Sequence, residues 1–219
     1  MAIAAHPDDI EFSCCGTISK FVDKGYQAIY VILTNGESGW KIKEVPVEER
    51  IKTREKEQLE AAKVIKAKEV IFLREKDGFL DYTNKLREKI VALIKKYKPE
   101  IVFTFDPGNK DFSNVNLHHR DHRVCAEIVF DAVFAAKNKF MFPGKSHAVN
   151  KFYLSGSNKP NHYEDITAKI DLKVEALSKH KSQFTDFQNV KKFILERLSK
   201  FSEKYKYSEA FRIVEIKTF

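Results

Sequence analysis

The sequence predicts an α/β protein: a single Rossmann-like three-layer α/β/α sandwich with a mostly parallel sheet, in which residues 1–219 form one domain. Short apolar runs rich in β-branched residues alternate four times with amphipathic helical segments. Residues 28–34 are apolar almost throughout, as expected for a strand buried on both faces of a parallel sheet. A chain of 219 residues suffices for one large core, and no linker, internal repeat or low-complexity segment divides it.

In the first half of the chain, the boundaries of these elements follow from periodicity and from turn residues. Pro7 ends the first apolar run, because a residue before proline avoids helical backbone. Gly25 and Pro99 are suited to end two of the helices. Strands are therefore expected at residues 1–5, 28–34, 69–73 and 101–105, and helices at 16–22, 47–66 and 86–97.

The second half begins with a loop over residues 106–116, where Pro, Gly, Asn, Asp and Ser are crowded together. If strands 1–5 and 101–105 are neighbours, as a doubly wound sheet allows, the segments that follow them meet at one edge of the sheet. Further along, helices are expected at 119–137, 165–181 and 190–205, strands at 152–154 and 211–216, and a loop at 141–151.

The composition is ordinary for a soluble globular protein, with 43% hydrophobic and 32% charged residues. The net charge of +8 favours anionic small molecules, and only weakly nucleic acid or an anionic membrane. Because the lysines are scattered among glutamates along predicted helices, we interpret most of this charge as solvated surface. Basic residues interleaved with exposed aromatics are not found in one stretch, so no nucleic-acid partner is expected.

The cysteines indicate a reducing compartment. Cys14, Cys15 and Cys125 form neither a CxxC motif nor an even-numbered framework, so we expect three reduced, buried thiols in a cytoplasmic protein. No stretch reaches the ~18 consecutive apolar residues of a transmembrane helix, so no membrane span is expected. No signal peptide precedes the first strand. That strand begins abruptly at Met1, and whether a few residues precede it is left open.

Four side chains able to hold a metal or a proton follow the first strand within six positions: His6, Asp8, Asp9 and Glu11. In an open parallel sheet, ligands collect where a strand ends and the chain turns toward a helix. One imidazole and three carboxylates are unfavourable there unless a cation or a reaction requires them. The alternative is a polar turn in which an aspartate caps a helix. Neither Gly-x-Gly-x-x-Gly nor a Walker lysine motif is present, so a nucleotide site is not expected.

A second cluster, His118-His119-Arg120-Asp121-His122, follows the loop after the fourth strand. On a helix, His122 shares a face with His118 and with His119. Together the clusters form a mixed histidine and carboxylate set that suits zinc, with manganese, iron or cobalt as alternatives. With three protein ligands and one open position, such a metal is catalytic, and spare carboxylate and histidine groups can serve as base and oxyanion partner. The alternative is a solvated, histidine-rich helix start.

These motifs resemble the LmbE-like, or PIG-L, family of zinc-dependent N-acetylglucosamine deacetylases. The resemblance spans nearly the whole chain in the family's order, and the pairing of the opening motif with the later histidine motif is its most specific part. The matching segments are His6-Pro7-Asp8-Asp9 with Glu11, Thr34-Asn35-Gly36-Glu37, Arg54-x-x-Glu57 with Ala61, Leu73, Asp77-Gly78-x-Leu80, His119-x-Asp121-His122, Asp165-Ile166-Thr167, Lys173-x-Glu175-Ala176-Leu177, His180-x-Ser182-Gln183 and Glu209-Ala210-Phe211.

The resemblance implies that His6, Asp9 and His122 hold the zinc. Asp8 would be the general base that deprotonates the water on the metal. The assignment of Asp9 to the metal and Asp8 to the proton depends on the resemblance alone, because spacing cannot separate two adjacent aspartates.

Other roles implied by the resemblance concern the substrate. His119, held by Asp121, would be the protonated partner that stabilises the oxyanion or delivers a proton to the departing amine. Arg54 and Asp77 match positions that lie near the sugar hydroxyls in the family. We expect Glu11 among the supporting residues that orient a metal ligand.

Two features depart from the family pattern. Leu117 stands where some members carry a tyrosine that helps to bind the oxyanion. His118 is an extra histidine, which we expect at the pocket rim or on the surface. His180 is expected either to line the pocket or to belong to the core, and the membrane anchor of eukaryotic members is absent from this sequence.

The sequence thus predicts a metal-dependent hydrolase that removes the acetyl group from an N-acetylglucosaminyl-type substrate and releases acetate. A zinc-dependent amidohydrolase acting on another N-acylated small molecule is the alternative, because the same site would attack other acylated amines. A basic nucleic-acid-binding domain is the non-enzymatic alternative. The expected partner is a small N-acetylated amino-sugar conjugate, and a homo-oligomer is left open.

Overall fold

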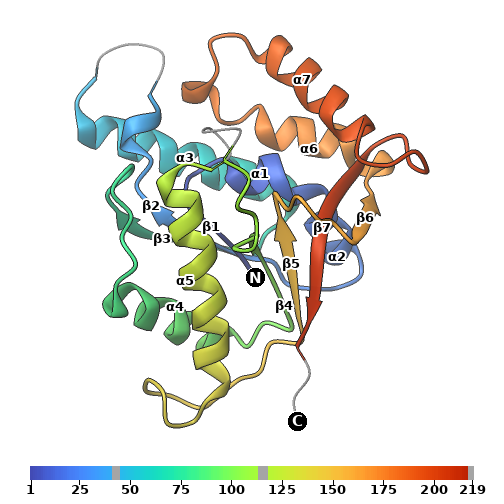
Figure 1. Ribbon diagram of the computed structural model, residues 1–219. Coiled ribbons are helices and arrows are strands. Elements are labelled where there is room, and N and C mark those ends of the chain that lie inside the picture. Colours follow the sequence, from blue (N-terminus) through green and yellow to red (C-terminus); the bar gives the residue numbers. More distant parts are fainter. Residues whose placement is uncertain (41–44, 113–117, 217–219) are drawn as a thin grey trace.

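The computed structural model describes residues 1–40, 45–112 and 118–216, and it confirms the predicted α/β class. Within these residues, a seven-stranded sheet runs through the centre in the order β3-β2-β1-β4-β5-β7-β6 (Figure 1). Strand β7 is antiparallel to both β5 and β6, and the other neighbouring strands are parallel, as predicted. The strands are β1 (Ala2–Ala4), β2 (Ile29–Thr34), β3 (Glu69–Glu75), β4 (Ile101–Phe105), β5 (Lys151–Ser155), β6 (His162–Asp165) and β7 (Ser208–Glu215).

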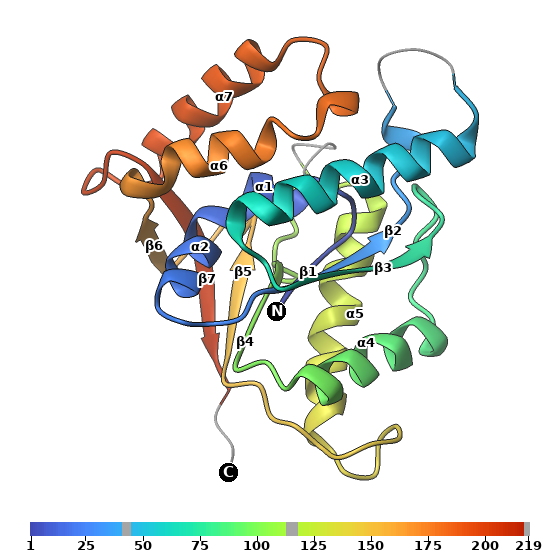
Figure 2. The same cartoon turned by 180° about the vertical axis from the view of Figure 1, so that it is seen from behind.

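Helices cover both faces of the sheet. Figure 2 shows α2, α3 and α6 in front of the sheet, while α4 and α5 pack together on the opposite face. Helix α7 packs beside α6 through Leu177, Ile194 and Leu198. No helix in the described ranges is long and apolar enough to cross a membrane. The helices are α1 (Asp9–Ser13), α2 (Cys15–Asp23), α3 (Val47–Ile65), α4 (Asn84–Tyr97), α5 (Arg120–Lys137), α6 (Ile170–Leu177) and α7 (Phe187–Ser199).

The strands divide the core into two halves. All six residues of β2 are buried, which confirms the interpretation of its continuous apolar run. Val31 and Leu33 belong to the half that contains α4 and α5, whereas Tyr30 and Ile32 belong to the half beneath α2 and α3. Because successive side chains of a strand point to opposite faces, one run of apolar residues serves both halves.

The predicted helix over residues 165–181 is wrong in extent. Residues 162–165 form β6, which pairs with β7, and α6 is only eight residues long. The side chain of Asp165 accepts the backbone N–H of Thr167 at 2.9 Å, so the chain turns there before the helix begins. Helix α1 was not predicted either, because its five residues are too few to show a helical period.

The topology brings the two polar clusters together. Strand β1 pairs with β2 on one side and with β4 on the other. The segment after β1 and the segment after β4 therefore leave neighbouring strands at the same edge of the sheet. In doubly wound proteins this is the point at which ligands bind, because the connections diverge there and leave a crevice.

Candidate metal centre

The chain passes from β1 into α1 through a strained turn. Asp8 has φ +99° and ψ −26°, a backbone conformation that costs a residue other than glycine about 1–3 kcal/mol. Two side chains of α3 hold this turn. The N–H of Asp8 donates to Oε1 of Gln58 at 3.0 Å, and the guanidinium of Arg54 donates to the carbonyl of Pro7. The turn is thereby fixed with Asp8 on the wall of a cleft.

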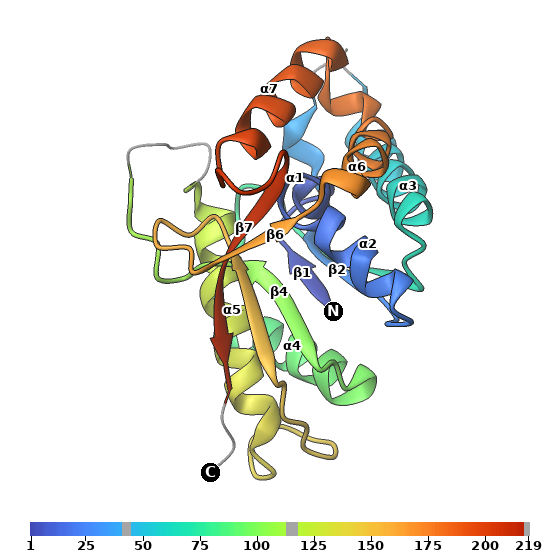
Figure 3. The ribbon, with the colours of Figure 1, turned by 90° about the vertical axis from the view of Figure 1, so that its right-hand side faces the viewer.

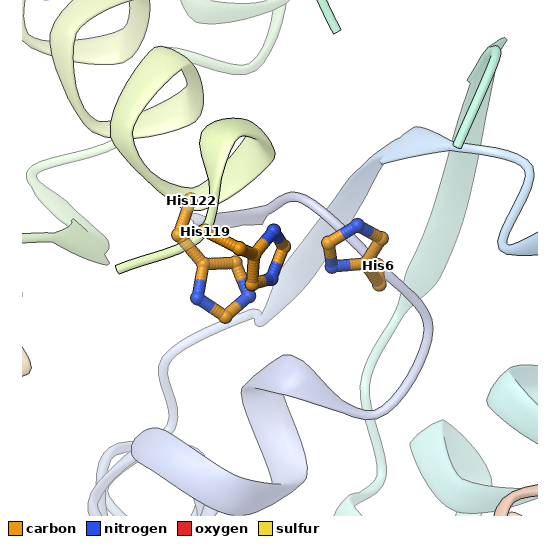
Figure 4. A group of neighbouring side chains, drawn as sticks. All are labelled: His6, His119 and His122. Carbon is orange, nitrogen blue, oxygen red and sulfur yellow. The ribbon is translucent and has the colours of Figure 1, made fainter. Parts of the chain in front are cut away.

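Three imidazoles converge beside this turn, one from the segment after β1 and two from the start of α5 (Figure 4). The ring centroids of His119 and His122 are 3.8 Å apart. The ring centroid of His6 lies 4.8 Å from that of His119 and 5.3 Å from that of His122. One ring nitrogen of each histidine lies within 4.8 Å of the other two. The side chain of His119 makes no hydrogen bond to any residue that the structure describes. Such a grouping of nitrogen donors is typical of a metal site.

Asp9 links two of these imidazoles. Its Oδ1 lies 3.0 Å from Nε2 of His122, and its Oδ2 lies 3.3 Å from Nδ1 of His6. Oδ2 also accepts the backbone N–H of His6 at 2.7 Å. Burial favours the neutral acid, but the neighbouring imidazoles of His122 and His6 outweigh it and hold the pKa of Asp9 well below its usual range. An ionised carboxylate therefore faces the histidines.

The far nitrogen of His6 is occupied by other carboxylates. Its Nε2 lies 3.1 Å from Oδ1 of Asp77 and 3.1 Å from Oδ2 of Asp121. Burial lowers the pKa of His6, but Asp9 and these two carboxylates more than compensate and raise it well above its usual value. Carboxylates that hold one nitrogen of a metal-binding histidine orient the ring and make the other nitrogen a better donor. This arrangement leaves Nδ1 of His6 on the side of Asp9.

The expected contact between Asp121 and His119 is not found in the described part of the chain. The carboxylate of Asp121 instead accepts from His6 and from the backbone N–H groups of Gly78 and Leu80, at 2.7 and 3.1 Å. His119 precedes the first turn of α5, whereas Asp121 lies within it, so the two side chains leave the helix in different directions. Asp121 thus supports His6.

The pKa values of His119 and Asp8 are shifted in opposite directions. Burial and the neighbouring His122 and His6 lower the pKa of His119 to about 4, so that its imidazole is neutral at pH 7. Burial raises the pKa of Asp8, and the charge of Asp9 adds to this effect although Arg54 opposes it. A carboxylate whose pKa is raised toward neutrality is better suited to accept a proton.

Both residues predicted near the sugar hydroxyls line the same cleft. Arg54 is 2% exposed, and its Nη1 donates to the carbonyl of Gly36 at 3.3 Å while its Nη2 lies 3.5 Å from Asp8. Asp77 accepts the N–H of Ser38 at 2.9 Å and contacts His6 through its other oxygen. They flank the imidazoles from the side of α3 and of the loop after β3.

The cleft above this cluster has a volume of about 1010 Å³. Phe105, at the end of β4, stacks on His122 with ring centroids 4.2 Å apart and forms part of the wall. His118 also lines the cleft, in agreement with its expected place at the rim. Leu117, which stands where some family members carry a tyrosine, lies outside the described residues.

Glu11 and His180 lie beneath the cleft and do not line it. Both are fully buried, and Nε2 of His180 is 3.2 Å from Oε2 of Glu11. The expected contact between Glu11 and a metal ligand is absent from the described residues, because Glu11 follows Asp9 by two positions and faces the opposite side of α1. Its carboxylate instead accepts from Nε2 of Gln58, at 3.1 and 3.2 Å, and Gln58 in turn holds Asp8.

Gln58 is the residue that sequence reasoning missed. It lies four residues after Arg54, so both side chains leave the same face of α3 toward the turn at Asp8. The only sequence signal was a buried-face position next to the Arg54-x-x-Glu57 motif. Gln58 itself is fully buried, which only the packing of α3 against α2 and α6 makes evident.

The donor set fits a transition metal. Imidazole nitrogens and a carboxylate oxygen are the ligands that zinc, manganese, iron and cobalt accept in proteins. An ionised, buried Asp9 that contacts the imidazoles of His6 and His122 would be stabilised by a cation beside it. The second group with ligand spacing, which comprises His6, Asp77 and Asp121, shares its imidazole with the first.

Residues 1–133 match the family model described as PIG-L, GlcNAc-PI de-N-acetylase. The chain is 32% identical over 195 residues to a diacetylchitobiose deacetylase of Thermococcus kodakarensis, covering 85% of this chain and 70% of that protein. It is 25% identical over 186 residues to a mycothiol S-conjugate amidase of Streptomyces coelicolor, covering 73% of this chain and 61% of that protein.

Among solved structures, the fold is similar to that of the N,N'-diacetylchitobiose deacetylase from Pyrococcus horikoshii. The TM-score is 0.90 at 28% sequence identity, and the superposition covers 98% of this chain and 82% of that one. The family match includes the turn at Asp8 and the histidines at the start of α5. This chain therefore belongs to the PIG-L, or LmbE-like, family of metal-dependent deacetylases.

Proposed function

We propose that the protein is a zinc-dependent N-deacetylase that hydrolyses the acetamido group of an N-acetylglucosaminyl compound and releases acetate. The observation that supports this most strongly is the convergence of three imidazoles with Asp8 and Asp9 at the wall of a large cleft. The deacetylases among its relatives support the same reaction.

We assign the metal to His6, Asp9 and His122, since Asp9 contacts both of these imidazoles. When bound, zinc supplies a Lewis acid that polarises the amide carbonyl and makes a water molecule acidic near pH 7. Manganese, iron and cobalt accept the same donors, so metal analysis has to decide between them.

Asp8 and His119 are the groups that handle protons and charge in this proposal. The carboxylate of Asp8 accepts a proton from the water that attacks the acetyl carbon. As the carbonyl oxygen gains negative charge, the neutral imidazole of His119 donates a hydrogen bond to it. When the C–N bond breaks, the proton held by Asp8 passes to the departing nitrogen, and acetate and the free amine are released. The lowered pKa of His119 favours this division of roles over a protonated His119.

Arg54 and Asp77 would bind sugar hydroxyls on the side of the cleft formed by α3 and the loop after β3. Both are already held by protein contacts, Arg54 to the carbonyl of Gly36 and Asp77 to the N–H of Ser38. Because these contacts fix the side chains before substrate arrives, little conformational entropy is lost on binding. The relative named an amidase supports other N-acyl substrates as the alternative.

The protein's compartment is proposed from its thiols. Cys14, Cys15 and Cys125 are free and buried, as is common where thiols stay reduced. We therefore place the enzyme in the cytoplasm, acting on a small amino-sugar conjugate.

The test is acetate release from a panel of N-acetylglucosaminides and simple N-acyl amines by zinc-loaded protein. We expect Asp8→Asn to lower turnover about 100-fold or more, the size of a general-base contribution, while the metal content is unchanged. Asp23→Asn, which alters an exposed aspartate of α2, serves as the matched control and should be fully active. Full activity of Asp8→Asn would refute the assignment of the base, and a protein that binds no metal would refute the whole proposal.

A further inference from the structure

The cleft extends well past the metal centre. Its volume of about 1010 Å³ equals the upper end of the ~300–1,000 Å³ range of pockets for drug-sized ligands, so it has room for more than one sugar ring. Figure 3 shows α7 above the edge of the sheet at which β1 and β4 end. We call the part lined by α7, by the first turns of α5 after His122 and by residues 106–110 the outer cleft.

The charges of the outer cleft are not balanced. Its two acidic side chains, Asp106 and Glu127, are each paired with a cation, at 2.8 and 3.3 Å. Arg123 and Arg197 also line it, and neither has a carboxylate partner within residues 1–40, 45–112 and 118–216. The outer cleft therefore carries uncompensated positive charge next to the proposed reaction centre.

Arg123 is partly used by the protein. Its Nη1 donates to the backbone carbonyl of His118, and its guanidinium lies over the ring of Phe112 with 5.5 Å between the guanidinium carbon and the ring centroid. It thus contributes charge to the outer cleft while its position is fixed by neighbouring protein groups.

Arg197 is the less satisfied of the two. Its guanidinium makes no hydrogen bond to any described residue and only packs over the ring of Phe201, 5.5 Å from the centroid. Burial lowers the pKa of Arg197, and the charge of Glu209, which is itself paired with Lys173, only partly opposes this effect. Arg54, which is also buried, differs because it donates to the carbonyls of Pro7 and Gly36. A half-buried cation of this kind is stabilised when an anion binds beside it.

An apolar surface accompanies this cation. Phe193 lies one helical turn before Arg197 on α7, lines the same cleft, and is 57% exposed. The ring provides a wall against which the non-polar part of a ligand can pack while the guanidinium binds its charged end.

We propose that the outer cleft binds an anionic group, a phosphate or a carboxylate, on the aglycone of the N-acetylglucosaminyl substrate, with Arg197 as its principal partner. This inference rests on the proposed deacetylase function and narrows its substrate class. A guanidinium presents parallel N–H donors that match the oxygens of either group, and such charge-assisted hydrogen bonds are stronger than neutral ones.

The experiment compares three glycosides: methyl N-acetylglucosaminide, which is neutral, carboxymethyl N-acetylglucosaminide and N-acetylglucosamine 1-phosphate. For zinc-loaded protein, KM and kcat are measured by acetate release, and Kd is measured by calorimetry for any glycoside that is not turned over. We expect the wild type to prefer at least one anionic glycoside about tenfold or more over the neutral one, the size of a charge-assisted hydrogen bond. The glycoside that is preferred shows whether the outer cleft binds a phosphate or a carboxylate.

The variants separate charge from packing. Arg197→Gln should remove the preference with less than a twofold change for the neutral glycoside, and Arg197→Lys should keep part of it. Lys192→Gln removes a positive charge from an exposed position of the same helix outside the cleft, and should change nothing. Thermal unfolding of each variant checks that the fold is retained.

Two results would overturn the inference: equal affinity of the wild type for all three glycosides, or equal weakening of all three by Arg197→Gln. These outcomes are distinct from failure of the proposed function. If no glycoside releases acetate but the calorimetric preference and its loss in Arg197→Gln are observed, the anion subsite stands and the deacetylase proposal fails. If acetate is released without any charge preference, the reverse holds.

Discussion

Two polar regions of opposite character meet at the short segment between β1 and α2. The first is the metal centre, formed by His6, Asp9, His119 and His122, which opens into the cleft. The second is a buried network on the other side of α1, none of whose side chains is reached by water. Its members are Glu11, Gln58, Lys173, His180 and Glu209.

The buried network satisfies most of its own polar groups. Nζ of Lys173 donates to Glu209 and to the carbonyl of Glu11, each at 2.7 Å. The carboxylate of Glu209 accepts the N–H groups of Gly16 and Thr17, at 3.0 and 2.7 Å, in the first turn of α2. These bonds tie α6, β7 and α2 to one another, as a polar network inside a protein is expected to do.

The metal centre differs because its groups line an open cleft. Three imidazoles and a carboxylate lie within contact of each other, and the ring of His119 has no hydrogen-bond partner among the described residues. Density of histidine and carboxylate residues therefore does not identify a functional site by itself. What distinguishes the two regions is access to the cleft, since the buried network also holds a ring nitrogen, Nδ1 of His180, without a hydrogen-bond partner among the described residues.

The sharpest test of this distinction removes a proposed ligand from the metal centre. Asp9→Ala should lower kcat/KM for acetate release about 1,000-fold or more, since a metal contributes several kcal/mol to the transition state. Zinc content measured by elemental analysis should fall in parallel, while circular dichroism shows an intact fold. Retention of a full equivalent of zinc by this variant would show that Asp9 is not a ligand.

The matching change in the buried network should affect stability. Lys173→Met leaves Glu209 charged and unpaired inside the protein, which typically costs 3–5 kcal/mol in the free energy of unfolding, so we expect a loss of about that size. Urea denaturation measures it. Lys63→Met, in an exposed pair with Glu60, is the control and should leave the midpoint unchanged. A small loss for Lys173→Met would contradict a structural role for the network.

Gln58 joins the two regions, so its removal tests how far one supports the other. Gln58→Leu deletes the acceptor of the Asp8 N–H and should lower kcat about 10–100-fold, as is typical for residues that orient catalytic groups. Zinc content and KM should change little. Gln27→Leu, an exposed glutamine bonded to Lys68, is the matched control. A rise in KM alone would place Gln58 in substrate binding instead.

The ion pair of Asp106 and Arg212 at the outer cleft lies in an environment intermediate between the open metal centre and the buried network. Although burial opposes ionisation, Arg212 holds the pKa of Asp106 below its usual value of 3.8. Because the pKa of Asp106 is lower in the folded than in the unfolded protein, its ionised carboxylate stabilises the fold at any pH above the unfolded-state pKa. This contribution is lost as the pH falls below about 4.

We therefore expect Asp106→Asn to lower the free energy of unfolding by about 1 kcal/mol or less at pH 7, because the pair is partly exposed and screened by solvent. The difference from wild type should shrink at pH 2–3 in thermal unfolding experiments that span this range. A difference that grows in acid would show that the pair does not act through the charge of Asp106.

The sequence by itself determined most strands of the sheet and the approximate position of the site. Nearly continuous apolar runs placed β1, β2 and β4, because burial on both faces leaves a strand no polar positions. Polar residues directly after β1 and β4 then had to meet, since parallel neighbours end at the same edge of the sheet. The pairing of His6-Pro7-Asp8-Asp9 with His119-x-Asp121-His122 was specific enough to indicate the family.

Only the tertiary structure decided which side chain contacts which. Asp8 and Asp9 are equivalent by spacing, yet Asp9 contacts two imidazoles while Asp8 is held by Gln58 and Arg54 of another helix. Strand β6 was hidden because its pairing with β7 joins residues more than forty positions apart. In each case the deciding contact crosses between elements distant in sequence, and the direction of a side chain there depends on how whole helices and strands pack.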